Sequence, residues 1–331
     1  MFAPAAARCA GRRCLVTGGL GFIGANLAVA LAHAGAHVTV VDGLIERHGG
    51  GRHNLVGADG IDVILADLVD ASAYEAAAAE AEFVFNLAGQ VSHVDSMTDP
   101  LGDLHVNTTG HVVLLELLRR LNPTVPVVYA STRQIYGRVQ YRPVDEEHPV
   151  HPVDVNGIDK YAGEQFHTLY AQVHGMRASA LRLTNIYGPR QRILGDHHGF
   201  IGTFIRRALR NESITLFGDG SQERDVLYVR DAVEAFVLAA TTEDAVGEVF
   251  NIGHPNARSL RDIADVIVGE VGNGQVVLEP WPDERKKIDI GSYSTDCSKA
   301  KRILGWEAET SLETGMRDTI AFIRDHEQVY L

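Results

Sequence analysis

The chain has 331 residues, of which 45% are hydrophobic and 22% are charged. This size and composition allow a full buried core and fit one large domain or two closely joined ones. The formal net charge is −13, which argues against a nucleic-acid partner and against an anionic membrane surface, because both favour a basic face.

Residues 1–11 are rich in alanine but are interrupted by Pro4 and Arg8. The segment is too short and too broken for a signal peptide, so we expect a flexible tail. A short apolar run at residues 14–17 then predicts the first strand, and the apolar density of residues 22–34 predicts a buried helix.

The turn between this strand and this helix reads Thr17-Gly18-Gly19-Leu20-Gly21-Phe22-Ile23-Gly24. Side chains at Gly18, Gly21 and Gly24 would keep a pyrophosphate away from the exposed amides at the positive end of the helix. The pattern therefore predicts a dinucleotide site, with a turn built only for packing as the alternative.

The next expected strand, at residues 37–41, leads to Asp42. A carboxylate at a strand end about 20 residues beyond the glycine turn accepts both ribose hydroxyls of NAD, and its charge disfavours a 2'-phosphate. We therefore predict NAD as the cofactor. Arg47 and Arg52 leave NADP as the alternative.

Strands and helices continue to alternate along the chain. Further strands are expected at residues 62–66, 83–87, 125–130, 178–183 and 249–252, and further helices at residues 72–81, 104–121 and 157–174. Such alternation predicts an α/β fold, a Rossmann-type doubly wound parallel sheet. We expect residues 12–186 to form the NAD-binding domain, which also receives a strand near residues 249–253. The pattern loosens beyond Tyr187, and residues 187–331 are expected to form mainly a smaller C-terminal substrate-binding lobe.

Short sequence blocks follow the glycine turn in a definite order. They are Asp67-Leu68, Asn86-Leu87-Ala88-Gly89, Asn107, Ser131-Thr132-Arg133-Gln134-Ile135-Tyr136-Gly137, Leu181-Arg182-Leu183-Thr184-Asn185-Ile186-Tyr187-Gly188-Pro189, Arg224-Asp225-Val226-Leu227-Tyr228-Val229-Arg230-Asp231 and Leu304-Gly305-Trp306. With them the chain resembles the extended short-chain dehydrogenases/reductases of the nucleotide-sugar epimerase/dehydratase family, of the UDP-glucose 4-epimerase type. The resemblance runs from Arg13 to about Phe322 and implies an NAD-dependent enzyme that modifies a nucleotide-diphosphate sugar.

The resemblance also implies roles for individual residues. The cofactor site would comprise Gly18, Gly21, Phe22, Ile23, Gly24, Asp42, Asp67, Leu68, Leu87, Ala88, Gly89 and Lys160. In it, Asp67 would hold the adenine amino group, Ala88 and Gly89 would let the nicotinamide half pass over the sheet, and Lys160 would hold the nicotinamide ribose. A helix cap at Asp67 and a plain surface lysine at Lys160 are the structural alternatives.

The substrate would be held by Gln90, Ser92, Arg133, Asn185 and Arg224. The resemblance places Asn185 and Arg224 at the diphosphate, where a guanidinium offers a bidentate fork to phosphate oxygens. An ion pair of Arg224 with Asp225 or Asp231 is the alternative. Thr132 would hydrogen-bond the hydroxyl that is oxidised.

Two departures from the family pattern concern the chemistry directly. Family members carry Tyr-x-x-x-Lys, but this chain reads Asn156-Gly157-Ile158-Asp159-Lys160. Asparagine does not ionise, so it can orient a hydroxyl but cannot take its proton. Tyr161 lies about 100° further round the helix and is a poor substitute. Members that dehydrate sugars at C4–C6 place Asp-Glu directly after the threonine, where this chain has Arg133-Gln134, so an ordinary 4,6-dehydratase is disfavoured.

Another side chain must then act as the base. His93 follows the fourth strand in a run that resembles one lining the sugar pocket of related dehydratases, and histidine titrates near neutrality. Tyr136 near Thr132 and the pair His197-His198 are alternatives. No third ligand stands at metal-site spacing, so we expect no metal.

These observations favour a nucleotide-sugar 4-epimerase with a non-standard base, acting through a transient keto-sugar. A nucleotide-sugar 5,6-dehydratase or decarboxylase, and a catalytically inactive NAD and nucleotide-sugar binding protein, are the alternatives. The resemblance implies a homodimer through residues 104–121 and 157–174, paired into a four-helix bundle. The odd set of three cysteines, Cys9, Cys14 and Cys297, predicts reduced thiols and a cytoplasmic protein. No apolar run approaches about 18 residues, so we expect no membrane partner.

Overall fold

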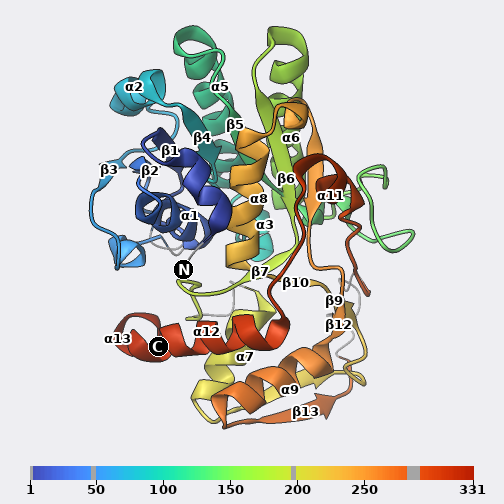
Figure 1. Ribbon diagram of the computed structural model, residues 1–331. Coiled ribbons are helices and arrows are strands. Elements are labelled where there is room, and N and C mark those ends of the chain that lie inside the picture. Colours follow the sequence, from blue (N-terminus) through green and yellow to red (C-terminus); the bar gives the residue numbers. More distant parts are fainter. Residues whose placement is uncertain (1–2, 46–49, 195–198, 282–290) are drawn as a thin grey trace.

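A computed structural model describes residues 3–45, 50–194, 199–281 and 291–331. Its centre is a seven-stranded parallel sheet with the order β11-β6-β5-β4-β1-β2-β3 (Figure 1). The strands are β1 (Arg13–Thr17), β2 (His37–Asp42), β3 (Ile61–Leu65), β4 (Phe83–Asn86), β5 (Val127–Thr132), β6 (Ala178–Leu183) and β11 (Val249–Ile252). All seven expected strands are present, and the predicted Rossmann-type sheet is confirmed.

Helices cover both faces of this sheet. One face carries α1 (Phe22–His33) and α8 (Val229–Thr241), and the other carries α2 (Ala71–Glu80), α5 (Gly110–Leu121) and α6 (Val155–His174). Successive side chains of a strand point to opposite faces. Val16, Phe85 and Val128 accordingly belong to the core beneath α1 and α8, whereas their neighbours in β1, β4 and β5 pack beneath α2 and α5.

The N-terminal segment is a correction to the expected flexible tail. Pro4–Cys9 form the 3-10 helix η1, whose Ala5, Ala6 and Cys9 are buried. The backbone amide of Ala5 donates to a carboxylate oxygen of Glu234 on α8 at 2.8 Å. Small apolar side chains at these positions let η1 lie close against α8, and proline suits the first turn of a helix.

The expected helix at residues 104–121 is divided into three parts. The segment α4 (Pro100–Leu104) leads into a π-helical turn, η4 (His105–Thr109), and α5 follows without a break. Before them lies α3 (His93–Thr98). No helix in the described ranges is long and apolar enough to cross a membrane.

A second, smaller hydrophobic core lies below the sheet in Figure 1. It is built by α7 (Phe200–Leu209), α9 (Leu260–Val271), α12 (Leu312–Asp325), α13 (Glu327–Tyr330) and the parallel pair β8 (Ser213–Phe217) and β13 (Gln275–Glu279). Shorter elements complete the fold: η3 (Arg52–Leu55), η5 (Arg133–Tyr136), η6 (Glu243–Ala245), α11 (Ser298–Leu304), the pair β7 (Asn185–Tyr187) and β10 (Val226–Tyr228), and the pair β9 (Glu223–Arg224) and β12 (Arg258–Ser259).

Part of the C-terminal half returns to the sheet. Besides β11, both α8 and α11 pack against the large core. Asp231 in the first turn of α8 then fixes a distant segment, because its carboxylate accepts hydrogen bonds from the backbone amide and the hydroxyl of Thr310, each at 2.8 Å. The indole nitrogen of Trp306 donates to the Asp231 carbonyl at 2.8 Å. Two of the sequence blocks therefore act together to hold the chain's end on the sheet.

Candidate active site

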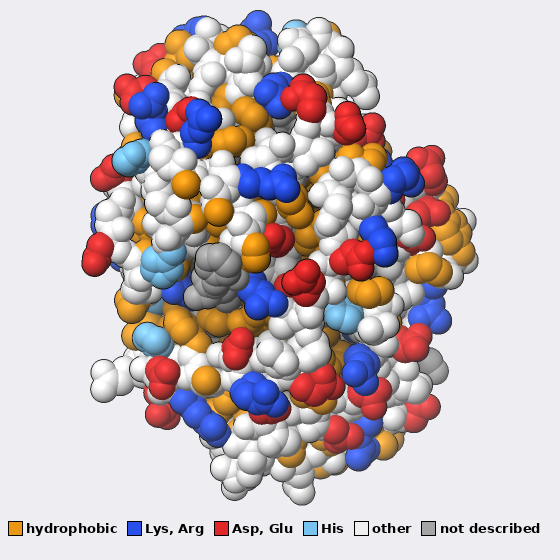
Figure 2. Space-filling model, in the orientation of Figure 1, with side chains coloured by type: hydrophobic (Ala, Val, Ile, Leu, Met, Phe, Trp, Pro, Cys, Tyr) orange, Lys and Arg blue, Asp and Glu red, His pale blue; other side chains and the backbone are white. Residues whose placement is uncertain are grey.

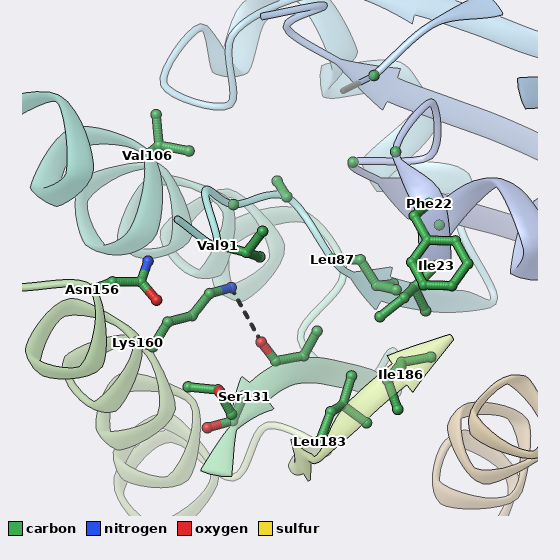
Figure 3. Close-up of a pocket in the computed structure, with 18 of the residues that line it drawn as sticks. Phe22, Ile23, Leu87, Val91, Val106, Ser131, Asn156, Lys160, Leu183 and Ile186 are labelled. Carbon is green, nitrogen blue, oxygen red and sulfur yellow. Dashed lines mark hydrogen bonds between the residues drawn. The ribbon is translucent and has the colours of Figure 1, made fainter. Parts of the chain in front are cut away.

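The strand order reverses between β1 and β4, and ligands of open parallel sheets bind beyond the strand ends at such a point. A cavity of about 440 Å³ lies there. Its walls come from the residues that follow β1, β2, β3, β4, β5 and β6, together with the start of α1 and the first turns of α6. Figure 3 shows Phe22 and Ile23 on one side of the cavity and Asn156 and Lys160 on the other.

The glycine turn has two kinds of glycine. A Cβ atom at Gly18, whose φ is +66°, would lie 2.6 Å from the Leu87 carbonyl oxygen, and one at Gly24 would overlap the Gly18 carbonyl. Chain packing alone therefore requires these two glycines. At Gly21 a Cβ would meet only the Gly18 carbonyl oxygen, at 3.2 Å. Gly21 lines the cavity, so there the missing side chain keeps the N-terminus of α1 open to a ligand.

Two carboxylates mark the far end of the cavity. Asp42 accepts hydrogen bonds from the backbone amides of Leu20 at 2.9 Å and Leu44 at 2.8 Å. Burial raises the pKa of Asp42, although these two amides oppose the rise. Asp67 also lines the cavity, and His105 Nε2 lies 3.1 Å from its Oδ2. Their places at the ends of β2 and β3 suit the ribose and adenine roles that the family resemblance implies.

Thr132 and Lys160 face the same cavity from β5 and α6. Thr132 Oγ1 accepts from the backbone amide of Gln134 at 3.2 Å, which leaves the threonine hydroxyl free to donate to a ligand. Lys160 is buried and its Nζ donates to the Ala130 carbonyl at 3.3 Å (Figure 3). Burial lowers the pKa of Lys160 to about 8, and the charge of Asp103 opposes that fall.

Gly89 is fitted to this lysine. A Cβ atom at Gly89 would lie 2.6 Å from Lys160 Nζ and 2.7 Å from Asn107 Oδ1. The glycine therefore leaves room for the ammonium group beside the floor of the cavity. This is a structural reason for the expected Ala88-Gly89 pair that the sequence alone did not supply.

Both ring nitrogens of His93 make hydrogen bonds to side chains of the site. Its Nδ1 is bonded to Oδ2 of Asp154, and its Nε2 lies 2.7 Å from Nε2 of Gln134. The imidazole lines the cavity. Burial alone would raise the pKa of Asp154, but the bond to His93 and the amide of Gly157 outweigh it and hold that pKa below its usual value. The arrangement fixes the ring with Nδ1 as donor and Nε2 as acceptor.

Asn156 lines the cavity but its amide is engaged in structure. Its Nδ2 donates to the Gln90 carbonyl at 2.8 Å and to Asp103 Oδ1 at 3.3 Å. The residue therefore ties the segment that carries His93 to the start of α6.

Gln90 and Ser92 do not line the cavity, contrary to their predicted contact with the substrate. Both are buried. The Gln90 side chain bonds the backbone amide and carbonyl of Ser92, while the Ser92 hydroxyl caps α3 by accepting from the Asp95 amide. Their role is to shape this turn, which presents Val91 and His93 to the cavity instead.

Tyr136, the predicted alternative base, is not among the residues that line the cavity. It is fully buried, its hydroxyl donates to Asn251 Oδ1 at 2.7 Å and accepts from Arg182 Nη1 at 2.7 Å. Burial raises its pKa to about 12, with Arg182 acting in the opposite direction. Arg182, which donates to the phenol oxygen, is itself paired with the buried Glu164 on α6. Tyr136 is therefore a structural residue.

Of the remaining predicted substrate residues, two line the cavity and one does not. Arg133 and Asn185 line the cavity. Arg224 is not among the lining residues, and its Nη1 donates to the carbonyls of Glu223 at 2.8 Å and Gly291 at 2.6 Å. His197, His198 and Arg47 lie outside the described residues.

The cavity has further walls that the sequence did not single out. They include Val91, Val106, Ser131, Gln134, Thr184, Ile186, Gln191 and Arg192. Ser131, Gln134, Thr184 and Ile186 stand beside predicted site residues at the ends of β5 and β6, so position within the sequence blocks was an available signal. Arg192 and Gln191 had none.

The donor set fits NAD. The open N-terminus of α1 beside Gly21 suits a pyrophosphate, Asp42 suits the ribose hydroxyls, and Gly89 leaves space above Lys160. In the described parts of the chain no group of three histidine, cysteine or acidic side chains is placed to hold a metal ion.

Comparison with known proteins agrees with this geometry. Residues 14–253 match the NAD dependent epimerase/dehydratase family. A UDP-glucose 4-epimerase of Mycolicibacterium smegmatis is 32% identical over 317 residues, covering 96% of this chain and 100% of the relative. A UDP-N-acetyl-alpha-D-glucosaminuronate decarboxylase of Bacillus cytotoxicus is 29% identical, covering 96% of this chain and 99% of the relative.

The fold has equally close counterparts. The crystal structure of the Thermotoga maritima UDP-glucose 4-epimerase with UDP-glucose superimposes with a TM-score of 0.85 at 33% identity, covering 95% of this chain and 99% of that one. Sheet, cavity and sequence thus lead to one conclusion: the chain belongs to the NAD-dependent epimerase/dehydratase family, whose members modify nucleotide sugars.

Proposed function

We propose that this chain is a nucleotide-sugar 4-epimerase in which His93, oriented by Asp154, replaces the family's tyrosine as the base. The observation that carries the proposal is the pair of hydrogen bonds at the imidazole, from Nδ1 to the Asp154 carboxylate and at Nε2 to the Gln134 amide. Thr132, Lys160 and His93 line the same cavity.

Each residue has a separate role in the oxidation of one sugar hydroxyl. NAD, when bound, supplies the hydride acceptor and returns the hydride to the sugar. The Thr132 hydroxyl orients the reacting hydroxyl, and His93 Nε2 takes its proton. The Asp154 carboxylate stabilises the imidazolium that results, as a buried carboxylate does for a base histidine in other enzymes. In the reverse step the His93 imidazolium would return its proton to the sugar oxygen, and the epimer results when the keto-sugar presents its opposite face for reduction.

In this mechanism the Gln134 amide holds the place of the sugar hydroxyl at the imidazole. Its Nε2 lies at hydrogen-bond distance from His93 Nε2, and its buried Oε1 has no partner among the described residues. A hydroxyl that displaces the Gln134 amide would restore the same hydrogen bond to the ring. The amide therefore holds the imidazole in its acceptor form until substrate arrives.

The test is turnover of a panel of UDP-, dTDP-, GDP- and CDP-sugars, with product identity read by chromatography and mass spectrometry. We expect an isomer of unchanged mass, and His93→Ala should lower kcat by about 10²–10⁴-fold. His151→Ala, at an exposed histidine outside the cavity lining, is the matched control and should keep the wild-type rate.

Other outcomes separate the alternatives. Loss of carbon dioxide would identify a decarboxylase and loss of water a dehydratase, while NAD binding without any turnover would identify an inactive binding protein. An active His93→Ala variant would remove His93 from the mechanism.

The proposal extends to the whole protein. The second hydrophobic core would form the substrate-binding lobe, because Gln191, Arg192 and Gly199 close the cavity from that side.

We also infer a homodimer through α5 and α6, which lie side by side in Figure 1. A cytoplasmic location fits the three free cysteines.

A further inference from the structure

Arg133 presents an unused guanidinium to the cavity. The residue is half-buried and lines the cavity wall. Its side chain makes no hydrogen bond or ion pair with the described residues, and its guanidinium carbon lies 4.9 Å from the centre of the Tyr293 ring. Stacking on a buried aromatic ring fixes the plane of the group. A partly desolvated guanidinium with open donors is a site for an anion.

The buried acid Asp225 interacts with Arg133 through its charge but does not fill this role. Asp225 is close enough for the charge of Arg133 to oppose the rise in its pKa that burial causes. Both of its carboxylate oxygens, however, accept hydrogen bonds from the hydroxyls of Thr184 and Thr295. Among the described residues no hydrogen bond joins Arg133 to Asp225, so the guanidinium donors are left for a ligand.

The place of Arg133 in the cavity indicates which part of a ligand would carry the anionic group. Arg133 directly follows Thr132, which faces the reacting hydroxyl in the proposed function. The carboxylates among the described lining residues, Asp42 and Asp67, follow β2 and β3. Three strand spacings, roughly 14 Å, separate β5 from β2 in the sheet. The charge of Arg133 thus acts at the sugar end of the cavity.

We propose that Arg133 binds a carboxylate carried by the sugar itself, so that the substrate is a nucleotide-linked uronic acid. This inference rests on the proposed function, because it takes Thr132 as the residue beside the reacting carbon. A guanidinium and a carboxylate pair through two parallel hydrogen bonds, which a neutral hydroxymethyl group cannot match. The Bacillus cytotoxicus relative is named for a substrate of this class.

The experiment compares ligands that differ only at this group. Calorimetry on the NAD-loaded protein would measure binding of UDP-glucuronic acid, UDP-glucose and UDP, with the dTDP-linked pair in parallel. We expect the uronate to bind at least about 10-fold more tightly than the neutral sugar. Arg133→Gln should remove that preference by weakening uronate binding about 10- to 100-fold, with little change for UDP.

Arg138→Gln is the matched control. It makes the same change of net charge at an exposed position of the same segment that does not line the cavity, and it should leave the preference intact. Thermal melting of each variant with NAD would confirm that the fold and cofactor site persist. Arg133→Lys keeps the charge without the fork and should retain only part of the preference.

Two results would overturn the inference. Equal weakening of the uronate, the neutral sugar and UDP would assign Arg133 to the diphosphate. A wild-type protein that binds both sugars equally would show that the site does not read the carboxylate. Because the readout is binding and not product formation, a uronate preference that depends on Arg133 would stand even if no epimer forms. Epimerisation of UDP-glucose without such a preference would leave the proposed function and remove only this inference.

Discussion

By the family resemblance, Asn156 stands where related chains carry the catalytic tyrosine. Its side-chain amide has a structural role and cannot accept the proton. By donating to the Gln90 carbonyl and to Asp103, it anchors the turn that leads to His93. Asp154, two residues earlier, holds the His93 ring. The asparagine that replaces the phenol and the aspartate that holds the imidazole therefore lie two residues apart, at the start of α6 and at its N-cap.

Lys160 gives the site a pH dependence with a definite sign. Burial lowers its pKa to about 8, so the ammonium form prevails below that pH and is lost as the pH rises past it. The cation favours an alkoxide developing nearby, and we expect kcat/KM to fall above about pH 8. A pH–rate profile measures this limb.

The origin of the limb can be assigned with two variants. Lys160→Arg keeps a positive charge throughout this range, so any activity that remains should lack the limb near pH 8. Lys301→Arg, at an exposed lysine, should leave the profile unchanged. A limb that persists in Lys160→Arg would belong to another group.

At the scale of elements, the N-cap residue of α6 has two functions on one side chain. Asp154 Oδ1 caps the helix by accepting from the Gly157 amide at 2.7 Å, and Oδ2 bonds His93. Serine caps helices about as well as aspartate but is too short to replace the carboxylate at the ring. We expect Asp154→Ser to keep stability within about 0.5 kcal/mol while kcat falls about 10²-fold or more.

The alanine variant separates the two functions. Asp154→Ala should lose the same catalytic factor and, in addition, about 0.5–2 kcal/mol of unfolding free energy from the lost cap. Urea denaturation and turnover assays on both variants measure the split. Wild-type turnover in Asp154→Ser would show that Asp154 serves only as a helix cap and that catalysis does not need its bond to His93.

The sequence predicts the elements of this molecule better than the contacts between them. Seven strands are readable because each is a short apolar run between turns, and the glycine turn and Asp42 indicate the strand ends where the cavity is found. The bond between His93 and Asp154 joins residues 61 positions apart, and no local pattern marks it. The burial of Tyr136 likewise depends on Arg182 and Glu164, which lie on other elements.

The same limit explains the other corrections. Alanine-rich residues 4–9 read as a tail, because the groove that buries them is made by α8, more than 200 residues later. Gln90 and Ser92 read as substrate ligands, because their polar side chains follow β4. Their mutual hydrogen bonds become visible only once the turn is formed.

At the scale of the whole molecule, charge is distributed unevenly between surface and cavity. The chain carries a net charge of −13, and acidic and basic side chains are interspersed over the face drawn in Figure 2. Among the described lining residues, the cations Arg133, Lys160 and Arg192 outnumber the carboxylates Asp42 and Asp67, which lie at the ends of β2 and β3. An acidic protein thus holds local cations where an anionic nucleotide sugar would sit.

The apolar surface of the molecule points to its assembly. Ile158, Leu169 and Val173 form an exposed stripe along α6, at positions that recur on one helix face. Met97 and Leu101, on α3 and α4, add to it, and Leu101 is 78% exposed. Apolar side chains gathered in this way are typical of a surface that another chain covers.

We therefore expect a homodimer whose interface includes this stripe. Analytical ultracentrifugation should give twice the chain mass, and the double substitution Leu169→Glu with Val173→Glu should yield monomers, because two buried carboxylates would lack partners at the interface. Leu278→Glu, at an exposed apolar residue of β13 in the smaller core, is the control and should remain dimeric. A wild-type protein that stays monomeric at micromolar concentration would contradict the interface, and dissociation by Leu278→Glu alone would move it to the opposite end of the molecule.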